Sequence, residues 1–394
     1  MEQWLIDWLN LGLRWLHLIT GIAWIGSSFF FNWLDASLEK PKTPKEGVEG
    51  ELWMVHSGGF YNVEKMQLTP AQIPPRLHWF MWEATFTWIS GFLLLVVLYY
   101  LGASAFMIDP AIADISPATA IAISLGTLAV SWIIYDTLWA SPLGEKGLLP
   151  IVISCLLWLG LAYGLTHVYG GRGAFLHVGA VMGTIMAANV WRRIIPAQRQ
   201  LVAATKSGTP ADARLAKAAK QRSIHNNYMT LPVVFIMISN HYPMTYGSEY
   251  NWIVLAAIAL GGAMIRHFFN LRHRGRNAWW LIPAGIALVI AAAIIARPGE
   301  RELTAGTRAD FTATAAIIAA RCAPCHSASP SFEGFDAPPA GVVFDTPADI
   351  ARFSARIKAQ AVDSETMPLG NMTGMTTEER AIIGAWIAAG AKTE

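Results

Sequence analysis

The sequence has little cysteine and little charge, and each shortage excludes a class of protein. Three Cys stand among 394 residues, too few for the disulfide framework of a small secreted domain. Charged residues make up 14% of the chain, against about 25% in ordinary soluble domains. The net charge is only +2, and nothing in its distribution suggests a nucleic-acid partner. Internal repeats and low-complexity tracts are also missing, which argues against a repeat architecture.

The sequence is instead rich in long runs of apolar residues. Hydrophobic residues make up 54% of the chain, with 17 Trp, and Trp favours membrane interfaces. The first run lacks a charged region and a cleavage site, so we expect it to stay as a membrane helix. Further runs are long enough to cross about 30 Å of hydrocarbon. The runs predict eight transmembrane helices, near 10–33, 79–101, 118–140, 149–168, 174–194, 226–243, 250–271 and 278–296.

Basic residues gather in alternate connections between these helices. The basic loops are 34–78, 192–222 and 272–276, and the second holds eight Lys and Arg. The intervening connections are poor in both residues. Because Lys and Arg mark cytoplasmic loops, both termini are predicted to lie outside the cytoplasm. The sixth helix is the weakest prediction, since it is short and contains Pro232. Removing it would place the C-terminus on the cytoplasmic side.

The chain after residue 297 differs in composition and is predicted to be a separate domain. Residues 298–394 carry eight Lys and Arg but twelve Asp and Glu, so this part is acidic. We predict a transmembrane catalytic domain over 1–297, a linker over 298–308 and a soluble domain over 309–394. Amphipathic helices are expected at both ends of the soluble domain. Thr377 is expected to cap the last one, because acidic residues follow it.

Cys322, Cys325 and His326 form a C-x-x-C-H motif, which is the attachment signature of a c-type haem. The two thiols bond the haem vinyl groups, and the adjacent His ligates the iron. The alternative is half of a zinc site, which needs two further ligands. Residues 298–394 hold no other Cys or His. We therefore predict one covalent haem c, and because haem is attached outside the bacterial cytoplasm, this agrees with the predicted topology.

Met367 is the first choice for the opposite iron ligand. Small cytochromes c often present this ligand as Met-Pro shortly before the last helix, and Met367-Pro368 fits. Met372 is the second choice, and the alternative for both Met372 and Met375 is loop packing. Met ligation raises the reduction potential of a haem. The predicted fold class is therefore all-α: a polytopic membrane helix bundle followed by a small domain like a class I cytochrome c.

Ionisable residues inside membrane spans are costly and suggest function. In the outer half of the predicted bundle, His17, His177 and His241 are candidate haem ligands, because neutral imidazole is a good iron ligand. A pair of them, His17 with His177 or His241, would hold a haem b between facing helices. The alternative is that these His are interfacial and hydrogen-bonded only.

The inner half holds a larger polar set, which we interpret as a substrate pocket. Arg266 offers a planar fork to a planar anion, and helix N-termini favour anions, so His225, Asn226 and Asn227 at the predicted start of the sixth helix suit one. The candidate catalytic residues are Glu83, Asp136, His225, Arg266 and His267. The candidate substrate-binding residues are His78, Asn189, Asn226, Asn227 and Arg266. The alternative is a structural salt bridge, such as Glu83 with Arg266.

Four segments together resemble the bacterial membrane-bound urate oxidases, or urate hydroxylases, which end in a cytochrome c domain. They are RLHWFMWEATFTWISG, SWIIYDTLWASPL, RSIHNNYMTLPVVFIMISNHYP and CAPCH with TMPLGNMTGMT. The membrane segments are loose motifs, but their combination with a C-terminal C-x-x-C-H is specific, and the resemblance covers essentially the whole chain. The segment around His17 also resembles a membrane haem family that oxidises protoporphyrinogen, which is an analogy only.

The resemblance implies that urate is converted to 5-hydroxyisourate, with oxygen from water. Electrons are then expected to leave through haem to a soluble cytochrome c or a cytochrome c oxidase. The implied location is the bacterial inner membrane, with the cytochrome domain in the periplasm. Two other interpretations stay open: a cytochrome c-linked dehydrogenase with a quinol or porphyrinogen donor, and a haem-linked sensor or transporter. A quinol site would be mostly apolar, and transporters usually carry inverted repeats.

Overall fold

The computed structural model describes residues 3–297, 309–332, 335 and 337–393. The predicted linker over 298–308 lies outside the described residues.

The eight predicted membrane segments are all helical. They are α1 (Gln3–Ser37), α2 (Trp82–Leu94), α4 (Pro117–Ala140), α5 (Leu149–Thr166), α6 (Gly171–Asn189), α8 (Ala213–Ser239), α10 (Asn251–Arg272) and α11 (Leu281–Ile295). A π-helical segment, η2 (Leu95–Tyr100), prolongs α2. In the described part of the chain, five helices are long and apolar enough to cross a membrane: 82–100, 117–140, 149–166, 171–207 and 251–272. The number of eight spans stays a prediction.

The all-α prediction is wrong in one place, because the loop 34–78 contains a β-hairpin. Strands β1 (Val48–His56) and β2 (Gly59–Met66) pair antiparallel. Ser57 and Gly58 connect them with φ of 49° and 76°, the left-handed geometry that two-residue hairpin turns require. A short turn, η1 (Pro70–Gln72), follows before α2. The structure is therefore mostly helical with one small sheet.

The basic segment 192–222 is also not a loop. A π-helical segment, η4 (Val190–Ile194), leads α6 directly into α7 (Ile195–Ser207). Gly208 ends this helix with φ of 67°, and the Asp212 side chain accepts from the Arg214 N–H to start α8. His225, Asn226 and Asn227 thus lie well inside α8 rather than at its N-terminus. The expectation that their free backbone N–H groups bind an anion was wrong.

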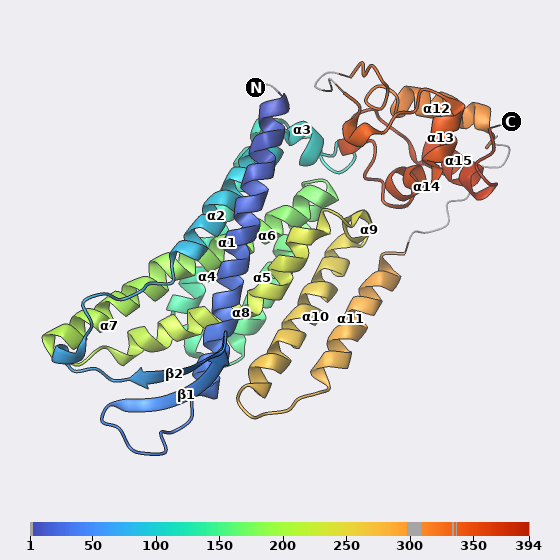
Figure 1. The fold of residues 1–394 in the computed structure, drawn as a ribbon. Helices are drawn as coiled ribbons and strands as arrows, with labels where there is room; N and C mark the ends of the chain where they lie inside the picture. Colours follow the sequence, from blue (N-terminus) through green and yellow to red (C-terminus); the bar gives the residue numbers. More distant parts are fainter. Residues whose placement is uncertain (1–2, 298–308, 333–334, 336, 394) are drawn as a thin grey trace.

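The two ends of the bundle differ in character (Figure 1). The hairpin, α7 and the α10–α11 connection lie at one end. The N-terminus, α3 (Ala103–Phe106) and α9 (Pro243–Tyr246) lie at the other, next to the C-terminal unit. The predicted basic loops therefore share the end remote from the C-terminal unit. The most buried helix is α6, which contacts α2, α4, α5 and α8.

The C-terminal unit is a small helical body with its own core. It contains α12 (Phe311–Arg321), η5 (Pro339–Gly341), α13 (Pro347–Arg352), α14 (Ser354–Ile357), η6 (Lys358–Asp363), η7 (Leu369–Asn371) and α15 (Thr377–Ala388). The first and last helices were predicted, and they pack on each other. The cap of α15 is Thr376 rather than Thr377, because Glu379 completes a capping box with Thr376. Ile318 and Ile383 are fully buried in this core.

Candidate functional site

The end of α12 gathers the C-x-x-C-H motif into one turn. The N–H groups of Cys325 and His326 donate to the Cys322 carbonyl at 3.2 and 2.9 Å. His326 Nδ1 lies 3.1 Å from the Val342 carbonyl, to which it donates, so Nε2 carries the lone pair. Burial lowers the pKa of His326, which keeps the ring neutral. A neutral ring held through Nδ1 is the form in which His ligates iron.

Both thiols of the motif are free of disulfides. Burial raises the pKa of Cys322 to about 12 and also raises the pKa of Cys325, so both are protonated at neutral pH. Thioether attachment needs two free thiols beside a His, whereas a zinc site would need further ligands and residues 298–394 hold no other Cys or His. The motif residues therefore fit covalent haem attachment, and a haem c held here would have His326 as one iron ligand.

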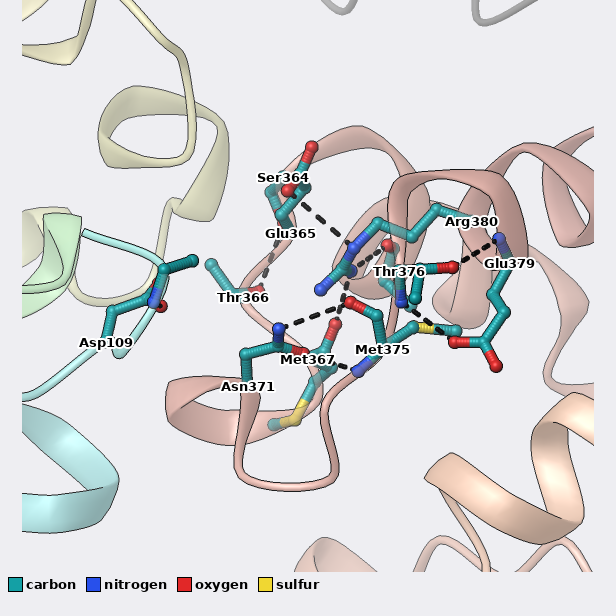
Figure 2. Close-up of polar contacts among 12 residues, drawn as sticks. Asp109, Ser364, Glu365, Thr366, Met367, Asn371, Met375, Thr376, Glu379 and Arg380 are labelled. Carbon is teal, nitrogen blue, oxygen red and sulfur yellow. Dashed lines mark hydrogen bonds and ion pairs between the residues drawn. The ribbon is translucent and has the colours of Figure 1, made fainter. Parts of the chain in front are cut away.

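Met367 lies in the loop between η6 and α15, where its backbone is fixed from two sides (Figure 2). Its N–H donates to the Gln360 carbonyl at 2.9 Å. Its carbonyl accepts from Arg380 Nη1 at 2.7 Å. Arg380 is only 3% exposed and also donates to the Ala361 carbonyl. The Met367 side chain packs on the core of the unit, while Met375 is buried in that core and Met372 is half-buried.

In the bundle, α4, α6 and α8 share a buried hydrogen-bond network. Asn189 Nδ2 donates to Asn226 Oδ1 at 2.9 Å and to the Tyr135 hydroxyl at 3.0 Å. The same hydroxyl lies 2.8 Å from His225 Nδ1. Asn226 in turn donates to the Met186 carbonyl at 2.9 Å. Asn189 and Asn226 were predicted as substrate ligands, and the structure brings them into contact.

Asn227 faces the other way, toward α10. Its Oδ1 accepts from Arg266 Nε at 2.8 Å and from Asn270 Nδ2 at 2.9 Å. The Arg266 guanidinium lies over the Phe29 ring of α1, 3.8 Å from the ring centroid. The next residue on each helix is also paired, because the Tyr228 hydroxyl lies 2.5 Å from His267 Nδ1. Because Asn226 and Asn227 are adjacent in α8, the two networks meet at this helix.

Asp136 pairs with two arginines. Arg193 of η4 donates to both of its carboxylate oxygens. Arg222 of α8 lies 3.1 Å from Asp136 Oδ1 and over the Tyr135 ring. Arg222 is almost fully buried, with 3% of its side chain exposed. A structural ion-pair cluster therefore exists at this depth, with Asp136 at its centre.

These side chains form what we call the polar layer: Tyr135, Asp136, Asn189, Arg193, Arg222, His225, Asn226, Asn227, Arg266 and Asn270. Five of its buried atoms have no hydrogen-bond partner among the described residues: Asn189 Oδ1, Arg222 Nη1, Asn227 Nδ2, Arg266 Nη2 and Asn270 Oδ1. An unpartnered buried polar group costs about 1–3 kcal/mol. Such groups, on the α6 side and on the α10 side of α8, point to a polar ligand or ordered water beside them. The three donors and two acceptors suit a ligand that offers both kinds of group.

Two predicted residues are placed apart from these contacts. Glu83 is in the first turn of α2, and its buried Oε2 has no partner among the described residues. The ion pair between Glu83 and Arg266 is not formed, since Arg266 Nε bonds Asn227 instead. His78 is exposed before α2 and packs edge-on against Phe80. The contacts of the structure therefore do not join Glu83 or His78 to the polar layer.

Sequence reasoning missed four members of the polar layer: Tyr135, Arg193, Arg222 and Asn270. Two of them carry a usable signal. Arg222 is four residues before Asn226, and Asn270 is four residues after Arg266. Residues four apart share a helix face. The other two are brought in by packing between helices, which spacing within one helix does not reveal.

The three outer His have different surroundings. His17 Nδ1 lies 2.9 Å from the Thr87 carbonyl and 3.1 Å from Ser90 Oγ. His177 bonds the Gly173 carbonyl through Nδ1 and Ser124 Oγ through Nε2, at 2.7 and 2.8 Å. A haem b between His17 and His177 would need Nε2 of His177 to exchange the Ser124 hydroxyl for iron, and this pair stays a prediction.

His241 is exposed after α8. His241 is the other residue that was predicted to pair with His17. A haem b between these two residues stays a prediction.

The fold and the polar layer define a helical-bundle protein with a buried polar site and an attached C-terminal unit. A family model described as "Urate oxidase N-terminal" matches residues 3–297, about three quarters of the chain. The chain therefore belongs to the urate oxidase N-terminal family. Comparisons with curated proteins and with solved structures gave no match. The family model ends at residue 297, before the C-terminal unit. The interpretation of that unit therefore depends on its own C-x-x-C-H motif.

Proposed function

We propose that the protein oxidises urate in the polar layer and passes the electrons to a haem c in the C-terminal unit. The family supports an oxidase of urate. The observation that carries the proposal is the presence of five buried, unpartnered polar atoms on α6, α8 and α10. Urate is a planar anion near neutral pH whose edge alternates N–H donors and carbonyl acceptors. Such an edge would satisfy donors and acceptors together, which an apolar quinol would not.

Arg266 is the residue that we assign to anion binding. Its guanidinium is held by Asn227 on one side and stacks on Phe29, which leaves Nη2 free to donate. A fixed, planar guanidinium matches a planar anion better than a flexible ammonium. Arg222 contributes a second buried cation, but it shares the one carboxylate of Asp136 with Arg193. Arg266 has no carboxylate partner in the described part of the chain, so we assign anion binding to it first.

The reaction needs proton acceptors as well as a binding site. Urate and water give 5-hydroxyisourate, two protons and two electrons. His225, which contacts the Tyr135 hydroxyl, and His267, which contacts the Tyr228 hydroxyl, are the candidate bases. Glu83 is a third, because its Oε2 is buried without a partner in the described chain. Asp136 is assigned to holding the bundle, because two arginines occupy it.

The C-terminal unit is proposed to be a cytochrome c domain. Cys322 and Cys325 would attach the haem, and His326 and Met367 would be its iron ligands. A haem c held by these residues supplies one-electron storage at a raised potential. An external acceptor, such as a soluble cytochrome c or a cytochrome c oxidase, would take the electrons onward. Two electrons per urate then require two such transfers.

The proposed location is the bacterial inner membrane, with eight spans. The five apolar helices support a membrane location. The basic segments and the C-terminal unit lie at opposite ends of the bundle (Figure 1), as the positive-inside rule requires for a periplasmic haem domain. Fusion of a reporter enzyme at the C-terminus tests this topology. A reporter that is active only in the periplasm is expected to be active when it is fused after residue 394. Activity of a reporter that works only in the cytoplasm would contradict the proposed topology.

The function itself is tested by turnover without dioxygen in ¹⁸O-labelled water. Purified protein, urate and oxidised cytochrome c are expected to give labelled 5-hydroxyisourate and two equivalents of reduced cytochrome c. A quinol and a porphyrinogen serve as competing donors. Turnover of either of these in place of urate would reject the proposal.

A further inference from the structure

The C-terminal unit meets the bundle through a contact that only small residues permit. Gly370, in η7, lies against α3 and against Ile108, two residues beyond the end of α3. A methyl group at Gly370 would lie 2.9 Å from the Ser104 carbonyl oxygen and 3.0 Å from that of Ile108. Contacts this short do not occur for a real side chain, so the two backbones approach as closely as they do because residue 370 is glycine.

A second glycine does the same from the bundle side. Gly247 ends α9, and a methyl group there would lie 2.1 Å from the Ser364 carbonyl oxygen of the C-terminal unit. Its φ is −83°, which any residue adopts. Glycine is thus not needed at position 247 for the local backbone. The close approach of Ser364 is the reason that the structure gives for it.

The predicted iron ligand Met367 borders this contact. A cavity of about 940 Å³ lies between the two parts of the chain, lined by Arg172 and His241 from the bundle and by Gln360 and Met367 from the C-terminal unit. Met367 and Gly370 belong to the same loop, three residues apart. Met367, which is proposed to help hold the haem, therefore lies on the side of the C-terminal unit that faces the bundle.

We propose that the surface formed by residues 364–371, docked on α3 and Gly247, is the electron-entry face of the C-terminal unit. We call it the docking face. This inference rests on the proposed function, since it concerns electrons released by urate in the bundle. Each electron would leave the bundle at its outer end and reduce ferric haem c to the ferrous state on the Met367 side. Gly247 and Gly370 act as positioning residues, because they set the separation of the two parts.

Three substitutions test the inference in the full-length holoprotein. Gly247→Ala and Gly370→Ala place a methyl group into the docking face from opposite sides. The matched control is Gly374→Ala, since Gly374 has φ of 67° and Gly370 has φ of 55°. Both therefore strain the backbone in a similar way. At Gly374 a methyl group would meet only Arg321 Nη1, at 3.8 Å.

Two readouts are taken from each variant. Stopped-flow absorbance follows haem c reduction by urate, with ascorbate as a donor that bypasses the bundle. Hydrogen exchange by mass spectrometry follows segments 103–109 and 364–371. We expect Gly247→Ala and Gly370→Ala to lose the fast urate-driven phase and exchange faster in both segments. Ascorbate reduction and the Met–iron band should be unchanged, and Gly374→Ala should behave as wild type.

The outcomes separate this inference from the proposed function. Fast urate-driven reduction in variants whose exchange has increased would overturn the docking face as the route. Unchanged exchange together with unchanged reduction would overturn it too. A wild-type protein whose haem c is reduced by ascorbate but not by urate would reject the proposed function, and the docking face with it. If Gly370→Ala loses the Met–iron band, its slower reduction would have a second cause. The test then depends on Gly247→Ala, because Gly247 is in the bundle and outside the C-terminal unit.

Discussion

At the scale of single residues, Arg266 carries the proposed recognition of urate. Arg266→Lys keeps the charge but loses the planar fork and the bond from Nε to Asn227. We expect KM for urate to rise about tenfold or more, since a hydrogen bond to a charged group is worth roughly 1.5–3 kcal/mol. Steady-state kinetics measures the change. Arg272→Lys, an exposed position at the end of the same helix, is the control. Equal KM values for wild type, Arg266→Lys and Arg272→Lys would contradict a role of Arg266 in binding urate.

Arg380 is the residue that fixes the Met367 loop. It is 3% exposed and donates to the carbonyls of Met367 and Ala361 (Figure 2). Arg380→Met leaves these carbonyls without that donor, so we expect the free energy of unfolding of the C-terminal unit to fall by about 3 kcal/mol. Denaturant titration followed at the haem band measures it. The control is Arg352→Met, which removes an exposed ion pair with Asp349. It should change the free energy of unfolding by about 0.5 kcal/mol or less.

The same titration reports on the iron ligand. If Arg380 holds Met367 in place, the Met–iron band weakens in Arg380→Met before the unit unfolds. A band that survives at full strength, with wild-type stability, would contradict the role given to Arg380.

At the scale of elements, Asp136 joins three segments of the bundle. It lies on α4 and pairs with Arg193 of η4 and Arg222 of α8. Asp136→Asn leaves the buried Arg222 without its charge partner. We expect about 3 kcal/mol of destabilisation, seen as a lower thermal midpoint in detergent. The comparison is Glu64→Gln in the exposed hairpin pair with Lys45, where the loss should be about 1 kcal/mol or less.

This variant also decides between two roles for Asp136. The sequence predicts a catalytic carboxylate, and the structure surrounds it with arginines. Loss of urate turnover at an unchanged thermal midpoint would restore the catalytic role and contradict the structural one.

The elements differ in how well the sequence predicts them. The membrane helices follow from apolar runs, because length and hydropathy suffice to locate them. The hairpin was missed because Trp53, Val55 and Phe60 are all exposed, so no buried face imposes an alternating pattern. Only Ser57-Gly58 signalled a turn. The start of α8 was placed too late, because 213–222 is helical by propensity and by the Asp212 cap rather than by hydropathy.

The candidate site was half predictable for a related reason. Asn189, Asn226, Asn227 and Arg266 are conspicuous as polar groups in apolar helices, and all four lie in the polar layer. Their partners depend on the rotation and packing of α6, α8 and α10, which one sequence does not specify. The expected pair of Glu83 with Arg266 failed for that reason, and Asn227 took its place.

At the scale of the whole molecule, the chain holds two candidate sites in two parts. The polar layer is in the bundle of the urate oxidase N-terminal family, and the C-x-x-C-H motif is in a unit docked at the end remote from the basic segments (Figure 1). Membership of the family accounts for residues 3–297. The proposed cytochrome unit gives the electrons a route out that does not need dioxygen at the site.

Reduction of haem c by urate, in the absence of dioxygen, tests this account most directly. Purified protein is oxidised, mixed anaerobically with urate and followed at the haem c absorption bands, with xanthine as a closely related purine control. We predict that urate reduces the haem fully and that, with excess oxidised cytochrome c, two electrons appear per urate consumed. A haem that ascorbate reduces and urate leaves oxidised would contradict the account.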